Sequence, residues 1–177
     1  MEVVVDRRSL VGALLAFPAC GWASAPAKAP PALLKPAIAD LPADPEVVTP
    51  LDLPEARWRE VLEPFAYQVL REEGTERAFT GRYWDLHDAG TYLCAGCGLG
   101  LFASADKFDS GTGWPSFTKA IRAGRVTERS DSSHGMTRVE LSCARCGGHQ
   151  GHVFNDGPRP TGMRYCINSV SLVFRPS

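Results

Sequence analysis

Two Cys-x-x-Cys pairs constrain this chain more than any other feature of its sequence. Cys94 and Cys97 form the first pair, and Cys143 and Cys146 form the second, far along the chain of 177 residues. Two such pairs have the spacing of a tetrahedral four-cysteine zinc site. Because four thiolates close the coordination shell, we expect one structural Zn²⁺ per chain that ties early and late strands together.

Each pair would place two thiolates on one tight turn, where Gly96 and Gly147 provide backbone freedom. Two alternatives remain open. The four cysteines could form two disulfides, which an oxidising compartment would favour. Either pair could also be a redox-active dithiol.

Composition limits the class of protein. The chain is 44% hydrophobic and 22% charged, which is typical of a soluble globular protein. Its net charge of −1 offers no basic surface for nucleic acid, so we expect no nucleic-acid partner. Six cysteines are too few for a small domain held together by disulfides. We expect a monomer with no transmembrane segment.

The N-terminus predicts an export signal over residues 1–27. Arg7 and Arg8 precede an apolar run at residues 10–17, which is far shorter than the roughly 20 residues that span a bilayer. Ala23-Ser24-Ala25 has the form of a cleavage site. Because paired arginines are typical of twin-arginine bacterial signals, we expect export to the periplasm.

Other interpretations of the N-terminus remain open. Cys20 could be a lipidated cysteine that anchors the protein, although Pro18 fits such a motif badly. The segment could also be the apolar N-terminus of a cytoplasmic protein. Residues 28–51 are rich in Pro and Ala and show no sustained period, so we expect an extended tether there. The folded domain would then occupy residues 52–177.

The hydrophobic pattern of that domain predicts two short helices followed by strands. Asp52 can cap a helix over residues 53–63, and Pro64 separates it from a helix over residues 65–73. In the segment 137–142 every second residue is apolar, which predicts one buried face. This order predicts an α+β fold, mainly antiparallel β, and argues against Rossmann and thioredoxin-like folds. The expected strands are residues 91–93, 125–129, 137–142, 151–155, 164–167 and 170–175.

Cys166 lies outside both cysteine pairs. A cysteine with no structural task, in a chain that also carries histidines, is a candidate nucleophile. Residues two apart in a strand share a face, so the Arg164 guanidinium can lie beside the sulfur and lower its pKa. Asn168 is also two residues away and can offer an amide donor. The alternative is a buried, inert cysteine.

His149 and His152 follow the second cysteine pair. Histidine titrates near neutral pH, so the two can supply protons, and Asp156 can orient one of them. They could instead bind a metal. The glycine-rich turn at residues 111–117 carries Trp114 and a second aromatic residue, which could equally belong to the core.

Together these motifs resemble the methionine-R-sulfoxide reductases, the B type of peptide methionine sulfoxide reductase. The resemblance runs from about residue 65 to residue 174 and keeps the family's order. The matching strings are Gly74-Thr75-Glu76-Arg77, Phe79-Thr80-Gly81, Tyr83-Trp84-Asp85, Lys107-Phe108-Asp109-Ser110-Gly111, Gly113-Trp114-Pro115-Ser116-Phe117, residues 131–136, Gly151-His152-Val153-Phe154, Asp156-Gly157-Pro158 and Arg164-Tyr165-Cys166-Ile167-Asn168-Ser169.

The resemblance implies a reaction. Cys166 would attack the sulfur of a methionine-R-sulfoxide in an oxidised protein. His149 and His152, positioned with Asp156, would protonate the departing oxygen. The products would be methionine and a Cys166 sulfenic acid, the reversible first stage of thiol oxidation.

The resemblance also implies how substrate binds. Trp114 would pack against the methyl group of the substrate, Phe154 would help to form the apolar wall, and Asn168 would form a hydrogen bond near the reacting centre. A rival class is a zinc-stabilised binding module with a groove formed by the same two aromatic residues. The reactive cysteine and both histidines argue against that class, because a binding module needs no nucleophile.

One position departs from the family pattern. Many relatives carry a resolving cysteine just before the Gly-Trp dipeptide, where this chain has Thr112. Apart from Cys166 and the four expected zinc ligands, the chain contains only Cys20. We therefore expect an external thiol, supplied by a thioredoxin-like partner, to reduce Cys166 directly.

Overall fold

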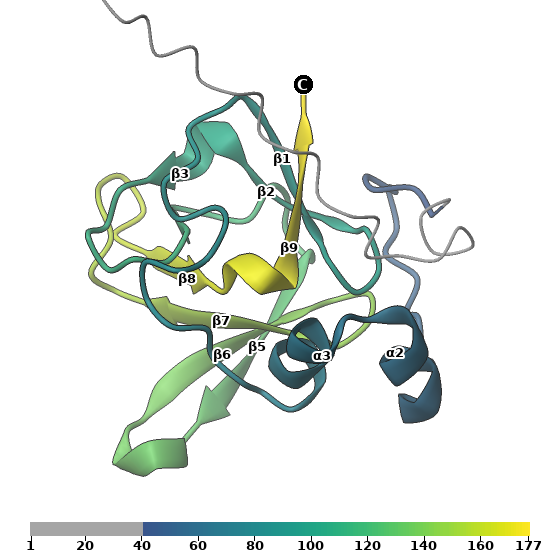
Figure 1. Ribbon diagram of the computed structural model, residues 1–177. Helices are drawn as coiled ribbons and strands as arrows, with labels where there is room; N and C mark the ends of the chain where they lie inside the picture. Colours follow the sequence, from purple (N-terminus) through teal and green to yellow (C-terminus); the bar gives the residue numbers. More distant parts are fainter. Residues whose placement is uncertain (1–40) are drawn as a thin grey trace, which may run out of the picture.

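The computed structural model describes residues 41–177. In this part of the chain two short helices, α2 (Glu55–Val61) and α3 (Pro64–Arg71), precede a body of antiparallel strands (Figure 1). The strands form a three-stranded sheet of order β2-β1-β9 and a six-stranded sheet of order β3-β4-β8-β7-β6-β5. The predicted α+β, mainly antiparallel fold is confirmed. The strands are β1 (Gly90–Cys94), β2 (Gly100–Ala103), β3 (Lys107–Phe108), β4 (Ser116–Phe117), β5 (Val126–Asp131), β6 (Arg138–Cys143), β7 (His149–Phe154), β8 (Arg164–Ile167) and β9 (Leu172–Pro176).

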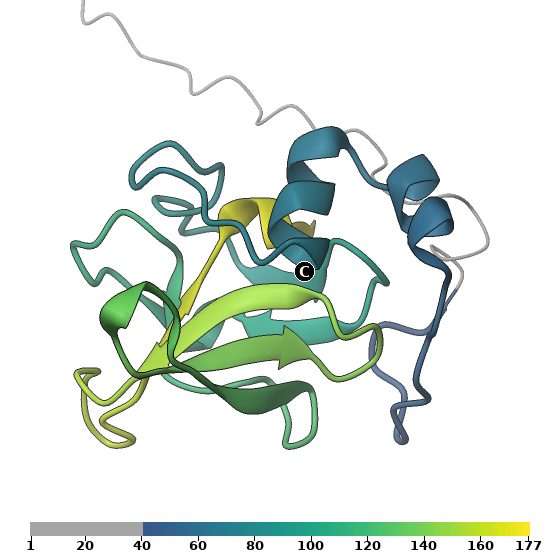
Figure 2. The ribbon, with the colours of Figure 1, turned by 90° about the horizontal axis from the view of Figure 1, so that it is seen from below.

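The two helices are shorter than predicted. The N-cap of α2 is Pro54, so Asp52 does not cap it as expected. Pro64 begins α3 instead of only interrupting a helix, since a first-turn residue needs no backbone N–H. Ala66, Val69 and Leu70 of α3 are buried, whereas Phe65, expected on the same face, is 48% exposed. Helix α3 packs against β7 and the short 3₁₀ turn η3 (Ser169–Ser171) (Figures 1 and 2).

Three strands were not predicted. Strands β3 and β4 have two residues each, too few to show an alternating pattern, and both are held by hydrogen bonds to neighbouring strands. Strand β2 is buried on both faces along most of its length, so its sequence does not alternate. The turn η3 delays the start of β9, which the sequence placed two residues earlier.

The core joins the two sheets through aromatic side chains. Phe102 of β2 and Phe117 of β4 are stacked, with ring centroids 4.5 Å apart. Tyr92 of β1 packs edge-on against Phe117, at 5.0 Å. All three are completely buried. Such aromatic pairs add packing energy to the burial of their large apolar surfaces, so they fix how the small sheet sits on the large one.

The described part of the expected tether, residues 41–51, packs on the domain. Ala43 accepts a hydrogen bond from the Gly100 N–H (2.6 Å), and Leu51 donates one to the Arg145 carbonyl (2.6 Å). Asp44 pairs with the buried guanidinium of Arg125, at 2.5 Å. The folded body therefore includes residues from Leu41 on, and a boundary at residue 52 is too late for these contacts.

The predicted export signal at residues 1–27, Cys20, and residues 28–40 of the tether lie outside the described residues. Over residues 41–177, no helix has the length and apolar character that crossing a bilayer requires.

Candidate active site

Four buried cysteines meet at one end of the domain, where the turn after β1 faces the turn after β6. Their sulfur atoms all lie within 4.8 Å of one another. The Sγ–Sγ distances are 3.6 Å between Cys94 and Cys146 and 3.5 Å between Cys97 and Cys143. A disulfide requires about 2.05 Å, whereas sulfur atoms around a tetrahedral Zn²⁺ lie roughly 3.8 Å apart when each Zn–S bond is about 2.3 Å. The cluster fits zinc and does not fit two disulfides.

The two turns of the cluster are built alike. The Gly98 N–H donates to the Cys94 carbonyl, and the Gly147 N–H donates to the Cys143 carbonyl, both at 2.8 Å. Both glycines have positive φ, 74° and 69°. The sequence analysis assigned this freedom to Gly96, and that was wrong, because the glycine that follows each pair carries the strained conformation.

The chemistry of the cluster also suits a cation. Hydrogen bonding among the four sulfur atoms, with burial added, raises the pKa of Cys94 and of Cys143 well above that of a free thiol, whereas hydrogen bonding lowers the pKa of Cys146 well below it. A divalent cation at the centre would instead stabilise all four thiolates. We conclude that these residues can hold one Zn²⁺ as a closed, structural site.

Cys166 lies on β8 and borders a cavity of about 130 Å³. In the sheet it is directly opposite His152 of β7 on one side and Ser116 of β4 on the other. The structure thus brings together the predicted nucleophile, one predicted proton donor and the predicted aromatic residues. The cavity is lined by Thr75, Trp114, Arg138, Gly151, His152, Phe154, Cys166, Ile167 and Asn168.

The pKa of the Cys166 thiol is raised, mainly because burial disfavours the thiolate. The positive charge of Arg164 and hydrogen bonds from Thr112 and Arg164 act in the opposite direction and do not overcome burial. The expectation that Arg164 lies beside the sulfur is met, but its charge does not lower the pKa below the ordinary value.

Arg164 is held by Asp156. Its Nε and Nη2 atoms donate to the two carboxylate oxygens of Asp156 at 2.8 and 2.9 Å, a bidentate ion pair. The guanidinium also stacks over the Phe154 ring, 4.4 Å from its centre. Asp156 therefore orients Arg164, and the prediction that it orients one of the histidines does not agree with these contacts.

A β-bulge brings the two histidines to the same side of the sheet. Residues three apart in a regular strand point to opposite faces. Here the register slips between Leu141 and Ser142, so Gln150 is the extra residue, and the ring centroids of His149 and His152 lie 5.4 Å apart. The side chain of Gln150 instead donates to the Cys94 sulfur (3.5 Å), toward the metal cluster.

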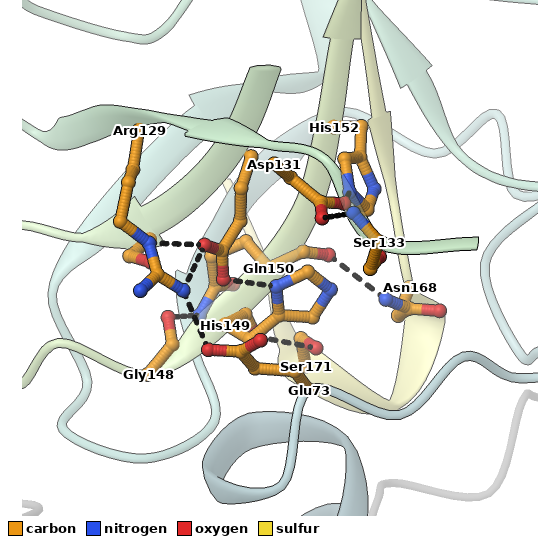
Figure 3. A network of polar contacts seen from close by, with 12 residues as sticks. Glu73, Arg129, Asp131, Ser133, Gly148, His149, Gln150, His152, Asn168 and Ser171 are labelled. Atoms are coloured by element: carbon orange, nitrogen blue, oxygen red, sulfur yellow. Dashed lines mark hydrogen bonds and ion pairs between the residues drawn. The ribbon is translucent and has the colours of Figure 1, made fainter. Parts of the chain in front are cut away.

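Two carboxylates that the sequence analysis missed contact the histidines (Figure 3). His149 Nδ1 lies 2.7 Å from Glu140 Oε1, and His152 Nε2 lies 2.8 Å from Asp131 Oδ2. Glu140 is directly opposite His152 in the β6–β7 pair and is only 3% exposed. A buried glutamate is unusual. Because Glu140 stands at a polar position of an alternating strand, the sequence pattern predicts an exposed residue, and only the pairing of β6 with β7 shows that Glu140 belongs to the site.

The two carboxylates and His152 have shifted pKa values. Burial lowers the pKa of His152, and its hydrogen bond to Asp131 offsets this only in part. Hydrogen bonds from Ser133, and then from His152, lower the pKa of Asp131. Burial acts to raise the pKa of Glu140, but hydrogen bonds from His149 and Arg129 lower it overall. At neutral pH the site holds two carboxylates beside its imidazoles.

The backbone of Glu76 forms hydrogen bonds with both Asn168 and Trp114, two of the predicted site residues. Its backbone N–H donates to Asn168 Oδ1 (3.1 Å), and its carbonyl accepts from Trp114 Nε1 (3.1 Å). Asn168 Nδ2 donates to the Gln150 carbonyl (3.2 Å). The Asn168 amide thus holds the cavity wall in place through backbone partners, in addition to bordering the cavity. Sequence reasoning did not assign Glu76 this role.

Thr112, at the position of the usual resolving cysteine, lies near enough to Cys166 to lower the pKa of its thiol. Its hydroxyl oxygen lies 2.8 Å from Ser110 Oγ, which in turn lies 2.8 Å from Ser116 Oγ. A row of hydroxyl groups therefore runs beside the nucleophile, on the strand and turn next to β8.

Comparison with known proteins identifies the family of this chain. Residues 62–176 match the SelR domain family. Three relatives, each called peptide methionine sulfoxide reductase MsrB, come from Thiobacillus denitrificans (62% identity over 122 residues, 69% of this chain and 92% of that protein), Agrobacterium fabrum (58% over 122 residues, 69% and 90%) and Leptospira interrogans (58% over 118 residues, 67% and 90%). The chain therefore belongs to the SelR family, the MsrB peptide methionine sulfoxide reductases.

Proposed function

We propose that this enzyme, a peptide-methionine (R)-S-oxide reductase, uses Cys166 as the nucleophile that reduces methionine-R-sulfoxide in oxidised proteins. The observation that carries this proposal is the direct pairing of Cys166 with His152 at a cavity lined by Trp114 and Phe154. A nucleophile, a proton donor and an apolar wall in one cavity suit a methyl sulfoxide better than a larger ligand.

The reaction balances with one proton. The Cys166 thiolate provides an electron pair to the sulfoxide, the bond between substrate sulfur and oxygen breaks, and that oxygen becomes bonded to Cys166 sulfur. One proton is taken up to complete the sulfenic acid, and the thioether of methionine leaves. Substrate sulfur is reduced and Cys166 is oxidised by two electrons. His152, with His149 behind it, supplies the proton.

Binding of the substrate methyl group belongs to Trp114 and Phe154. The Trp114 ring is fixed by its hydrogen bond to the Glu76 carbonyl, and the Phe154 ring is fixed by the stacked guanidinium of Arg164. Asn168 holds the strand end beside the nucleophile and offers its amide near the reacting atoms. Rigid aromatic walls bind the substrate at low entropic cost.

An external thiol regenerates the enzyme. The four other cysteines in the described part of the chain lie in the buried cluster, so none of them can resolve the sulfenic acid. A thiol attacks Cys166, forms a mixed disulfide and releases water, and a second thiol then frees Cys166. A thioredoxin-like protein suits this role because it presents two thiols in sequence.

One Zn²⁺ per chain supports the fold without entering the reaction. When bound, it supplies four metal–sulfur bonds that hold the turns after β1 and β6 together. Gln150 donates to Cys94 from the strand that carries both histidines, so the metal cluster also supports the catalytic strand.

Export to the bacterial periplasm completes the proposal. Its support is the Arg7-Arg8 pair followed by a short apolar run, in a segment that precedes the matched family region. Periplasmic recovery of the full chain, lost when both arginines become lysine, would support twin-arginine export. Recovery of unprocessed protein in the cytoplasm would favour a cytoplasmic protein. Recovery of acylated protein on the membrane would favour a lipid anchor on Cys20.

Turnover of separated sulfoxide epimers tests the function. The full chain and its Cys166→Ser variant are incubated with R and S epimers of a methionine-sulfoxide peptide and dithiothreitol. We expect reduction of the R epimer only, absent in the variant. Turnover that survives the substitution would rule out Cys166 as the nucleophile, and folded, zinc-loaded protein that reduces neither epimer would rule out the activity.

A further inference from the structure

We propose that Glu140 positions His149 for proton delivery, and that its ion pair with Arg129 sets how tightly His149 holds that proton. The inference rests on the proposed function and adds two residues to it. Neither residue borders the cavity that contains Cys166. Both act through His149 and are positioning residues.

The hydrogen bond fixes which nitrogen of His149 is free. A carboxylate can only accept, so His149 Nδ1 carries a hydrogen toward Glu140 Oε1 at 2.7 Å. Exchange of a second proton is then confined to Nε2. His149 is 3% exposed, and its Nε2 has no hydrogen-bond partner among the described residues.

A polar cavity of about 230 Å³ connects the two histidines. It has room for a few water molecules, each of which occupies about 30 Å³ in the liquid. His152 borders both this cavity and the one that contains Cys166. A proton on His149 can therefore reach His152 through the cavity. Its lining comprises Glu72, Glu73, Thr75, Asp131, Ser133, Arg138, Glu140, His149 and His152.

The charged groups that line a cavity together with His149 come from β5, β6, α3 and the segment just after α3, and they are Arg129, Asp131, Arg138, Glu140, Arg71, Glu72 and Glu73. Asp131 is paired with Arg138 (2.6 Å) and contacts His152, so its negative charge is directed to these two residues and not to His149. Glu140 is the carboxylate that contacts His149 itself. Glu72 and Glu73, just after α3, also border the cavity.

Arg129 moderates the Glu140 charge. Its Nε and Nη2 lie 2.9 and 2.7 Å from Glu140 Oε2, and Nη2 also lies 2.6 Å from Glu73 Oε1 (Figure 3). The result is a chain of alternating charge from Glu73 through Arg129 and Glu140 to His149. Removing Arg129 leaves the negative charge of Glu140 uncompensated beside His149. Removing Glu140 takes away the carboxylate that contacts His149.

Substitutions of Glu140 and of Arg129 are expected to have opposite effects on the protonation of His149. Glu140→Gln keeps the shape but removes the charge that His149 contacts, so the midpoint measured for His149 should be lower in the variant than in the wild type. Arg129→Gln should raise that midpoint. We would follow His149 by long-range ¹H–¹⁵N NMR in the full chain and measure kcat/KM against pH for all proteins. In each variant, the inflection of kcat/KM against pH that reports on His149 should shift in the same direction as the NMR titration of His149.

Glu128→Gln is the matched control, because this exposed glutamate lies on the same strand as Arg129. Glu128→Gln should change neither the NMR titration of His149 nor the dependence of kcat/KM on pH. Arg129 is 66% exposed, so its variant keeps the test informative even if Glu140→Gln fails to fold. Shifts of the same sign in both variants, or an unchanged titration of His149 in both, would overturn the inference. A wild-type enzyme without turnover would instead reject the proposed function.

Discussion

Cys166 and His152 are directly opposed residues of the antiparallel strands β8 and β7. Opposed residues share a face and have Cβ atoms roughly 5 Å apart, so the imidazole and the sulfur reach the same cavity. Gly151 allows this approach, because a Cβ there would lie 2.0 Å from the Cys166 carbonyl oxygen. The proposed nucleophile and the proposed proton donor are thus placed by sheet register, the most rigid relationship that the fold offers.

The reactivity of free Cys166 should rise at unusually high pH. Burial raises its pKa above the ordinary value of 9.0, so the thiol is protonated at neutral pH and the reactive thiolate forms only on the alkaline side. Iodoacetamide labelling of Cys166, followed by mass spectrometry from pH 6 to 11, should show a midpoint above 9. Arg164→Met should move that midpoint upward by about one unit, while Arg175→Met, on the exposed end of β9, should not. A wild-type midpoint near neutrality would contradict this account.

Thr112→Cys should create an internal disulfide with Cys166. Thr112 lies near enough to Cys166 to lower the pKa of its thiol, so a thiol at position 112 is expected to reach the sulfenic acid. After one turnover without reductant, mass spectrometry should find a disulfide between positions 112 and 166 in the variant and a sulfenic acid in the wild type. Thr118→Cys, at the residue just after β4, is the control. If the variant retains a stable sulfenic acid, the two side chains are not adjacent in solution.

Metal removal should unfold the domain. Structural zinc sites contribute on the order of 10 kcal/mol to folding, which is comparable to the whole stability of a typical domain. Purified protein should contain one zinc per chain, and Cys97→Ser should lose both the metal and the cooperative thermal transition. Cys166→Ser should keep both. A metal-free protein that melts at the wild-type temperature would show that the cluster is not a structural zinc site.

Asp44→Ala should destabilise the domain by about 1–3 kcal/mol. The Arg125 guanidinium is 2% exposed and would keep only its bond to the Pro45 carbonyl (2.8 Å). Urea unfolding gives the free energy of unfolding of each variant. Asp52→Ala, which changes an exposed residue just after this segment, should stay within about 0.5 kcal/mol of wild type. Equal stability of both variants would mean that residues 41–51 do not contribute to the fold.

Local sequence patterns were sufficient to predict the cysteine cluster and the antiparallel fold, whereas Thr75, Arg138 and Ile167 also line the cavity and were not among the predicted site residues. Cys-x-x-Cys spacing predicts a cluster that can hold a metal ion, and residues two apart in a strand share a face, which predicts Arg164 near Cys166. Resemblance to a family supplied the roles of Trp114, Phe154 and Asn168. The cluster and the fold could be predicted because each depends on neighbours in sequence or on motifs of several residues, whereas the roles of Trp114, Phe154 and Asn168 stay predictions.

The missed features depend on strand pairing. Glu140 and Asp131 reach the histidines from neighbouring strands, and the bulge at Gln150 is set by a register slip that no alternating pattern reveals. For the same reason Asp156 was assigned to the wrong partner, since its proximity in sequence suggested the histidines. Val139 is 36% exposed although the alternating pattern predicted a buried face, because that part of the β5–β6 hairpin projects away from the core (Figure 1).

The most direct test of the account is a single turnover without reductant. Full-length reduced enzyme is mixed with an excess of methionine-R-sulfoxide peptide and a sulfenic-acid trap, and the products are identified by mass spectrometry. The account predicts one equivalent of methionine peptide per chain and the trap attached to Cys166. A disulfide between Cys20 and Cys166, or methionine formed while Cys166 remains a free thiol, would contradict it.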